Sequence, residues 1–493
     1  MIATSFVQEE SAVAPMPLGH IMALVTALTL NWFLANALPS QLFSWTSLLL
    51  FGWLLLVVAR ISAPALILLL PVVITRGATM ISLMAIEAGA YMPEVNRLGA
   101  AGDASASFVL FTAIFFLVAA VVFRALERPA IAFARSPLLD DVVALLGWPV
   151  VLVCAALGAL AFLHGLQGGF PLLAGVDRFL YRREYSSGLV LILLDNKFLF
   201  AALLGVIAFA PRYQPLLKAG AIATFLALTG LYFLFGDKFF TILSEVAFFA
   251  MPLLLARQGR IGRTLLLLAP LAGALLCAAL GATLYIYSGY GRLPLDRTMT
   301  LVGERTAGQG ELWFVATRDA RNVTNWDANL VARSLAPLDA EAPAASAFSH
   351  GVETYYFIQH YAPAKLAASF RKNQGWVQLT MGTEAMALVM FGYVGVAVVM
   401  ALLGILVGFA ALYLRRGFES RFPISLFFAV WTFLQIYFSV QQASLWTIAA
   451  PGQVKRLLLF LTIEIVLLAF NRAQILSASS RNRASAFRQR GIA

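Results

Sequence analysis

The sequence predicts an all-α fold: a polytopic membrane helix bundle of about twelve transmembrane helices with one large, partly helical outer loop domain. Hydrophobic residues make up 61% of the 493 residues and charged residues only 12%. The mean hydropathy is +0.84. A soluble domain of this size needs far more polar surface, and a disulfide scaffold needs more than Cys154 and Cys277. Soluble enzymes, nucleic-acid-binding modules and disordered chains are therefore excluded.

The spans follow from the length of the apolar segments. A helix needs roughly 20 apolar residues to cross the hydrocarbon core, because its backbone polar groups must be hydrogen bonded inside the chain. About twelve segments approach this length. We place them at 20–36, 42–59, 62–86, 106–123, 139–164, 187–209, 219–235, 239–256, 264–287, 384–413, 422–440 and 455–471. Pro39 requires a tight turn between the first two, and Gly236 interrupts the seventh and eighth.

Basic residues in the short connections predict the orientation, because Lys and Arg accumulate on the cytoplasmic side. One set of connections carries Arg124, Arg128, Arg135, Arg212, Lys218, Arg257, Arg260, Arg263, Arg415, Arg416 and Arg421. Both termini are then cytoplasmic. The outer face receives segments 87–105, 165–186, 288–383 and 441–454. The net charge of +11 is thus largely explained by topology and requires no nucleic acid partner.

These spans divide the chain into four parts. Residues 1–287 hold nine transmembrane helices, 288–383 form the outer loop domain, 384–471 hold three more helices, and 472–493 are a basic cytoplasmic tail. Within the loop domain, we expect helices at 319–335 and 347–372, separated by a linker rich in Ala and Pro. In the tenth span, Gly404 and Gly408 permit close helix packing.

Arginines on the predicted outer face need a reason other than topology. Segment 175–185 contains Arg178 and Arg182, with Asp177 and three aromatic residues beside them. Guanidinium groups bind phosphate through two parallel hydrogen bonds, so this segment is a candidate phosphate site. A belt that binds ordinary lipid head groups is the alternative.

Charged residues inside predicted spans are a second signal. A charge at mid-bilayer costs roughly 2.5–3.5 kcal/mol, so Arg76, Asp195 and Lys197 should each face a partner or a watery cavity. Asp195 and Lys197 are two positions apart and point to different faces, so each should pair with another helix. Lys238, in the turn after Gly236, offers a donor at membrane depth. A structural ion pair and a plain polar turn are the alternatives.

The outer loop domain contains two of the four histidines. His350 and Glu353 lie three positions apart on one predicted helical face, an arrangement that suits a base and the residue that orients it. His360 follows near the same face, although a single surface histidine is often inert. No HxxxH or DxD spacing and no phosphate-binding GxxxxGK[ST] loop is present, so we expect neither a metal nor a cofactor.

Three short pieces carry a family resemblance: Gly-Val-Asp-Arg-Phe-Leu-Tyr at 175–181, Gly-Asp-Lys-Phe at 236–239, and Arg305 followed by Gly-Glu-Leu-Trp at 310–313. With the large outer loop, the chain resembles the bacterial O-antigen or oligosaccharide repeat-unit polymerases (Wzy type). That resemblance implies a glycosyltransferase of the bacterial inner membrane. It would move a glycan from undecaprenyl pyrophosphate to a sugar hydroxyl of the next lipid-linked repeat unit.

The resemblance also implies roles for residues. Arginines would hold the leaving pyrophosphate, a base would accept the hydroxyl proton, and aromatic rings would stack on sugars. The phosphate ligands would be Arg178, Arg182, Arg297 and Arg305, with Arg76 and Lys238 at the pocket floor. The base would be His350, Glu353 or Asp177, and the other substrate-binding residues Trp313, Tyr355, Tyr356 and His360.

The implied partners are the undecaprenyl-pyrophosphate-linked oligosaccharide, membrane lipids, a chain-length regulator and a flippase. Two other functions stay open. An O-antigen ligase resembles the polymerase but uses the lipid A core as acceptor. A flippase or other transporter moves its substrate without forming a bond, and charges should then line a central cavity.

Overall fold

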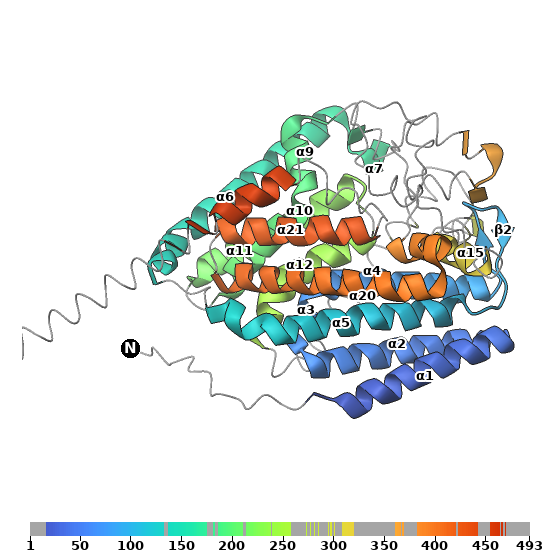
Figure 1. The fold of residues 1–493 in the computed structure, drawn as a ribbon. Coiled ribbons are helices and arrows are strands. Elements are labelled where there is room, and N and C mark those ends of the chain that lie inside the picture. The colour runs from blue at the N-terminus through green and yellow to red at the C-terminus, as the bar shows by residue number, and fades with distance from the viewer. Residues whose placement is uncertain are drawn as a thin grey trace, which may run out of the picture.

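Long apolar helices dominate the computed structural model of the protein (Figure 1). It describes residues 16–132, 137–174, 181–182, 186–210, 213–237, 239–257, 308–319, 360–365, 367–368, 382–420, 423–441 and 454–463, together with residues 273, 277, 281, 284, 294, 296, 297, 300, 465, 466 and 469. Within these residues, seven helices are long and apolar enough to cross a membrane, and a bent pair is an eighth candidate. The chain is therefore an all-α membrane helix bundle.

The helices follow one another as the apolar segments do. The long ones are α1 (Leu18–Ala37), α2 (Gln41–Ile61), α4 (Leu70–Glu87), α5 (Ala104–Ala132), α6 (Pro137–Gly168), α11 (Pro215–Leu234) and α20 (Thr383–Ser420). The bent pair is α9 (Gly188–Asp195) and α10 (Lys197–Phe209). The other elements are α3 (Ala63–Leu68), α7 (Pro171–Ala174), α12 (Phe239–Ala256), α15 (Glu311–Asp319), α21 (Pro423–Gln441), β1 (Tyr91–Met92) and β2 (Arg97–Leu98).

Six predicted segments each coincide with one long apolar helix: 20–36, 42–59, 106–123, 139–164, 219–235 and 384–413. The last of these helices, α20, is kinked at Gly392, whose φ is 66°. The third predicted segment is divided at Leu69 into α3 and α4, and the sixth is bent by 63° at Asn196. Helices α12 and α21 match two further segments but have shorter apolar stretches. Most of 264–287 and the last residues of 455–471 lie outside the described residues, as does most of 288–383. Twelve spans and a separate loop domain therefore remain predictions.

The expected helix at 319–335 is described only at its first residue, Asp319, so it stays a prediction. The described helix here is α15, which begins at Glu311 and ends at Asp319. Residues 320–335 lie outside the described part of the chain, as does most of the segment 347–372.

Side chains outside the core are largely apolar on the first two helices. Exposed residues of this kind are Leu18, Met22, Val25, Leu30, Phe33, Leu42, Trp45, Leu49 and Leu56. In water such a surface would drive aggregation, whereas lipid tails match it. This face of α1 and α2 therefore suits contact with a bilayer.

One end of the bundle gathers helix ends from distant parts of the chain, and we call it the α15 end. Glu87, at the end of α4, accepts hydrogen bonds from Ser44 Oγ of α2 (2.6 Å) and from the Ser105 N–H of α5 (3.1 Å). Thr383 Oγ1, at the start of α20, donates to the Val440 carbonyl of α21 (2.7 Å). Figure 1 shows α15 against the same end of α4, α5 and α20.

Helices α5 and α20 run side by side in the same direction through the centre of the bundle (Figure 1). A Cβ added at Gly404 would lie 2.7 Å from the Phe115 carbonyl oxygen, and one at Gly408 would lie 2.9 Å from that of Ala119. The close packing predicted for these two glycines is therefore confirmed. It fixes the register of α20, which carries Glu384 at its start, against α5.

Leucine at Gly408 is expected to destabilise the fold by about 1–3 kcal/mol, because its side chain meets the backbone of α5 and the helices must separate. Gly52→Leu in α2 is the matched control, since nothing lies within 4 Å of its added Cβ. Thermal unfolding of the purified protein in detergent measures both. Equal midpoints for the two variants would contradict this packing.

Candidate functional site

A buried ion pair joins two helices whose residues lie 308 positions apart in the sequence. Arg76 of α4 is 5% exposed, Glu384 of α20 is 3% exposed, and the Arg76 guanidinium donates to Oε1 of Glu384. The Arg76 guanidinium also lies 5.6 Å from the centre of the Phe108 ring of α5. Since an unpaired charge inside a bilayer is costly, the Glu384 carboxylate stabilises Arg76 in this apolar helix.

A small polar pocket lies beside this ion pair. Its lining residues are Thr75, Arg76, Thr79, Gln309, Gly382, Glu384 and Gln441. The space amounts to about 10 Å³, which is about enough for one water molecule. Oε2 of Glu384 has no hydrogen-bond partner among the described residues. Oε2 of Glu384 can therefore accept a hydrogen bond from one further donor, such as a water molecule or a hydroxyl group.

A second group of charges lies at the bend between α9 and α10. Lys197, the first residue of α10, has its Nζ 2.5 Å from Oδ2 of Asp237. Glu245 of α12 is fully buried and interacts electrostatically with Lys197. Neither of its carboxyl oxygens has a hydrogen-bond partner among the described residues. Asn196, at the bend itself, donates its side-chain N–H to the Ile192 carbonyl (2.9 Å). Broken helices with charges at the break form ion and substrate sites in many transporters.

Aromatic rings connect the two charge groups. The ring centres of Phe198 and Phe438 are 6.1 Å apart, and those of Phe438 and Tyr437 are 5.2 Å apart. The Tyr437 hydroxyl then donates to the Pro71 carbonyl of α4 (3.4 Å), in the helix that carries Arg76. Lys197 and Arg76 therefore belong to one packed region, but neither contacts the other in the described structure.

Asp195, on the other side of the bend, accepts a hydrogen bond from Nη2 of Arg182 at 2.9 Å. Because both side chains are substantially exposed, this pair contributes little to stability. Asp195 and Lys197 thus have different partners, as predicted, but the partner of Lys197 lies in the turn after α11 and not on another helix. Arg182, which was predicted to bind phosphate, is paired with the Asp195 carboxylate in this structure.

Helix α15 is anchored to the start of α5 by Trp313. Its indole N–H donates to the Ala104 carbonyl (2.8 Å), and its ring meets Phe108 and Phe111 edge-on at 6.0 and 6.1 Å. Trp313 is only 3% exposed. In this arrangement its function is to position α15, and stacking of Trp313 on a sugar remains a prediction.

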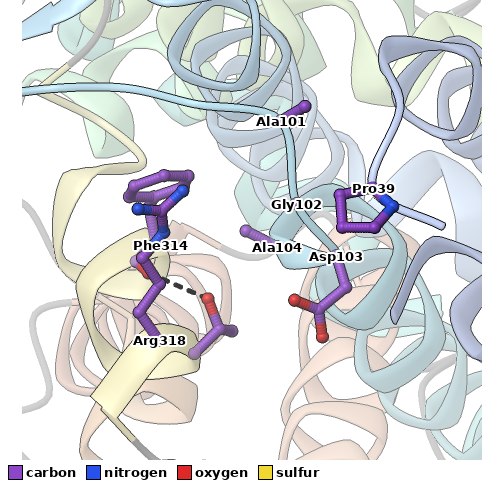
Figure 2. Close-up of a pocket in the computed structure, with 8 residues that line it drawn as sticks. Pro39, Ala101, Gly102, Asp103, Ala104, Phe314 and Arg318 are labelled. Carbon is purple, nitrogen blue, oxygen red and sulfur yellow. Dashed lines mark hydrogen bonds between the residues drawn. The ribbon is translucent and has the colours of Figure 1, made fainter. Parts of the chain in front are cut away.

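An open pocket of about 260 Å³ lies between α15 and the residues that lead into α5. Figure 2 shows its walls: α15 on one side, and the turn after α1 together with the residues that lead into α5 on the other. The lining residues are Pro39, Ala101, Gly102, Asp103, Ala104, Phe314, Thr317 and Arg318.

The first residue of α15 is a buried acid outside the spanning helices. Glu311 accepts the Glu94 backbone N–H on Oε2 (3.0 Å), while its Oε1 has no partner among the described residues. Burial and the nearby Glu94 carboxylate raise the pKa of Glu311 from 4.5 to about 8. The docked helix therefore holds Glu311 protonated at neutral pH.

Docking of α15 is expected to weaken as the pH rises from about 4.5 to about 8, and to change little above that window. Undocked Glu311 ionises in this range whereas docked Glu311 stays protonated, so alkali favours the undocked state. Hydrogen exchange of the α15 peptide, corrected for intrinsic rates, measures the effect. Glu311→Gln should remove this dependence, and an unchanged pH profile in that variant would rule out Glu311 as its origin.

The predicted site residues are only partly within the described structure. Arg76, Arg182, Arg297, Trp313 and His360 are described, and Arg297 and His360 are exposed at their positions. Arg76 and Trp313 both lie at the α15 end. No described contact joins either of them to Arg182, Arg297 or His360. Outside the described residues lie Asp177, Arg178, Lys238, Arg305, His350, Glu353, Tyr355 and Tyr356.

The sequence reasoning missed Glu384, Gln441 and Gln309, which share a pocket with Arg76. One signal was present for Glu384. It is the first residue of the predicted span 384–413, and an acid at the edge of an apolar run is a candidate partner for a buried arginine.

Residues 349–454 match the model of a family of unknown function (DUF6418). This segment includes Glu384, Tyr437 and Gln441, so it contributes one side of the Arg76 pocket. No curated protein and no solved structure matches the chain.

Proposed function

We propose that this protein polymerises lipid-linked oligosaccharide repeat units into O-antigen or exopolysaccharide. It would act at the outer face of a bacterial inner membrane. The substrate would be an undecaprenyl-pyrophosphate-linked oligosaccharide. A chain-length regulator and a flippase would be its partners. The proposal includes cytoplasmic termini, twelve spans and a periplasmic loop domain at 288–383.

The observation that carries this proposal is the buried Arg76–Glu384 pair at the α15 end. The described helix α15 belongs to the predicted outer loop, so this end would face the periplasm. There an arginine that is already desolvated, with donors beyond those used by Glu384, suits the charge of a leaving pyrophosphate. The space beside Arg76 holds about one water, so the proposal requires that it widens when the substrate binds. The opposite end of the bundle holds Arg124 and Arg415, which supports a cytoplasmic assignment for that end.

In the proposed step, the oxygen of an acceptor sugar hydroxyl attacks the anomeric carbon of the donor glycan. The bond between that carbon and the pyrophosphate oxygen breaks, and its electron pair leaves with undecaprenyl pyrophosphate. The hydroxyl proton passes to a base, for which we propose His350 first and Glu353 or Asp177 next. Arginines stabilise the leaving group, so the step needs no metal ion or ATP.

A transporter or lipid flippase is the second candidate. The bend at Asn196, with Lys197, Asp237 and Glu245 beside it, is the observation that favours it. An O-antigen ligase differs from the polymerase only in its acceptor, and no described contact distinguishes the two.

Deletion of the gene in its own host, followed by gel analysis of the surface glycan, tests the proposal. A core that carries one repeat unit and no ladder is expected for a polymerase. Bare core with long lipid-linked polymer would identify a ligase. Bare core with the repeat unit retained on the cytoplasmic side would identify a flippase.

A further inference from the structure

The pocket between α15 and the start of α5 contains an arginine held in a fixed plane. The Arg318 guanidinium lies 4.5 Å from the centre of the Phe314 ring, and one of its nitrogens donates to the Ala100 carbonyl (3.3 Å). Phe314 is buried beneath it, whereas Arg318 is exposed. Arg318 lines the pocket, and the N–H donors of its guanidinium that Ala100 does not use are the donors it can offer to a ligand.

The opposite wall carries a carboxylate. Asp103 precedes the first turn of α5, its backbone carbonyl accepts from Ser107, and its side chain is nearly buried. Figure 2 shows Asp103 and the stacked pair of Phe314 and Arg318 on opposite sides of the pocket. The pocket therefore offers hydrogen-bond donors on one wall and acceptors on the other.

These walls favour a neutral polar ligand over a phosphate. A phosphate near Arg318 would also face the Asp103 carboxylate, and that carboxylate already compensates the positive N-terminus of α5. A ring with several hydroxyl groups donates to the carboxylate and accepts from the guanidinium at once. The volume of about 260 Å³ lies below the usual range for drug-sized ligands, which suits a single ring.

We propose that this pocket binds one sugar ring of a glycan, at a site separate from the Arg76 pocket. The small residues Ala101, Gly102 and Ala104, on the wall opposite α15, leave room for the ring. The site lies beyond the ends of α1 and α5, where a glycan is accessible from water. The source of the sugar is taken from the proposed function, and the inference rests on that function in this respect. The pocket would hold the glycan at a second position, outside the transfer site.

Saturation-transfer NMR on the full-length protein in detergent, with methyl hexopyranosides and methyl N-acetylhexosaminides as probes, tests the proposal. We expect binding by the unaltered protein and a loss of about tenfold or more in Arg318→Ala, which removes a charged hydrogen-bond donor. Ala101→Phe, which fills the pocket without changing its charge, should abolish binding as well. Arg97→Ala removes an exposed arginine of β2 at the same end and should bind normally.

Glycerol 3-phosphate is the competing probe. Binding of this phosphate in place of the sugars would overturn the proposal in favour of a lipid head group. Sugar binding that survives both pocket variants, or no sugar binding at all, would also overturn it. The glycan gel of the deletion strain tests the polymerase function independently. A lost ladder without sugar binding would reject the sugar site and leave the polymerase function standing. Sugar binding with an intact ladder would reject the polymerase function alone.

Discussion

Replacing Arg76 by methionine is expected to abolish polymer formation and to destabilise the fold by about 3–5 kcal/mol, because Glu384 then remains as a buried carboxylate without its cation. Thermal unfolding in detergent and the glycan ladder of a complemented deletion strain measure the two effects. Arg97→Met, at an exposed position of the same end, is the control and should change neither.

A double variant separates the structural role of Arg76 from its proposed role in transfer. Arg76→Met with Glu384→Leu removes both charges and should recover most of the stability, since an apolar pair of similar size replaces a buried ion pair well. Polymer should still be absent, because the leaving pyrophosphate loses its arginine. A full ladder from the double variant would show that the pair only stabilises the bundle.

The second large effect is expected at Lys197. Methionine at this position removes the cation that pairs with Asp237 and interacts with the buried Glu245, and we expect a loss of about 3–5 kcal/mol. Glu245→Gln is the matched variant and should cost much less, because it removes a buried acid and keeps the pair of Lys197 and Asp237. Equal unfolding midpoints for the two variants would contradict this account of the cluster.

The same two variants bear on the choice of function. If transfer occurs at the Arg76 pocket, Glu245→Gln should keep the glycan ladder. If the bend between α9 and α10 serves transport, this folded variant should instead trap the repeat unit on the cytoplasmic side. The ladder of Glu245→Gln therefore distinguishes the polymerase from the transporter without a large loss of stability.

The helices were predictable because hydropathy and length decide them almost alone in a membrane protein. The interruptions were harder to predict. At the bend, the Asn196 side chain donates to the Ile192 carbonyl, and the kink within α20 lies at Gly392, which has a positive φ. Asn196 and Gly392 both lie inside apolar runs of high mean hydropathy, so a hydropathy average over the run does not reveal the interruption of the helix.

The partners of buried charges could not be predicted from the sequence. The cost of burial indicates that Arg76, Asp195 and Lys197 need partners, but not which ones. Glu384 lies 308 positions from Arg76, and Asp237 lies 40 positions from Lys197. Lipid-facing and core-facing residues are equally apolar in such a bundle, so hydropathy does not identify the neighbours of a helix.

The most direct test of the central claim uses the purified protein in lipid nanodiscs with undecaprenyl-pyrophosphate-linked repeat units. The account predicts that glycan chains longer than one unit form, that undecaprenyl pyrophosphate is released in step with each bond, and that folded Arg305→Ala forms none. Repeat units that stay single in the presence of folded, unaltered protein would contradict it.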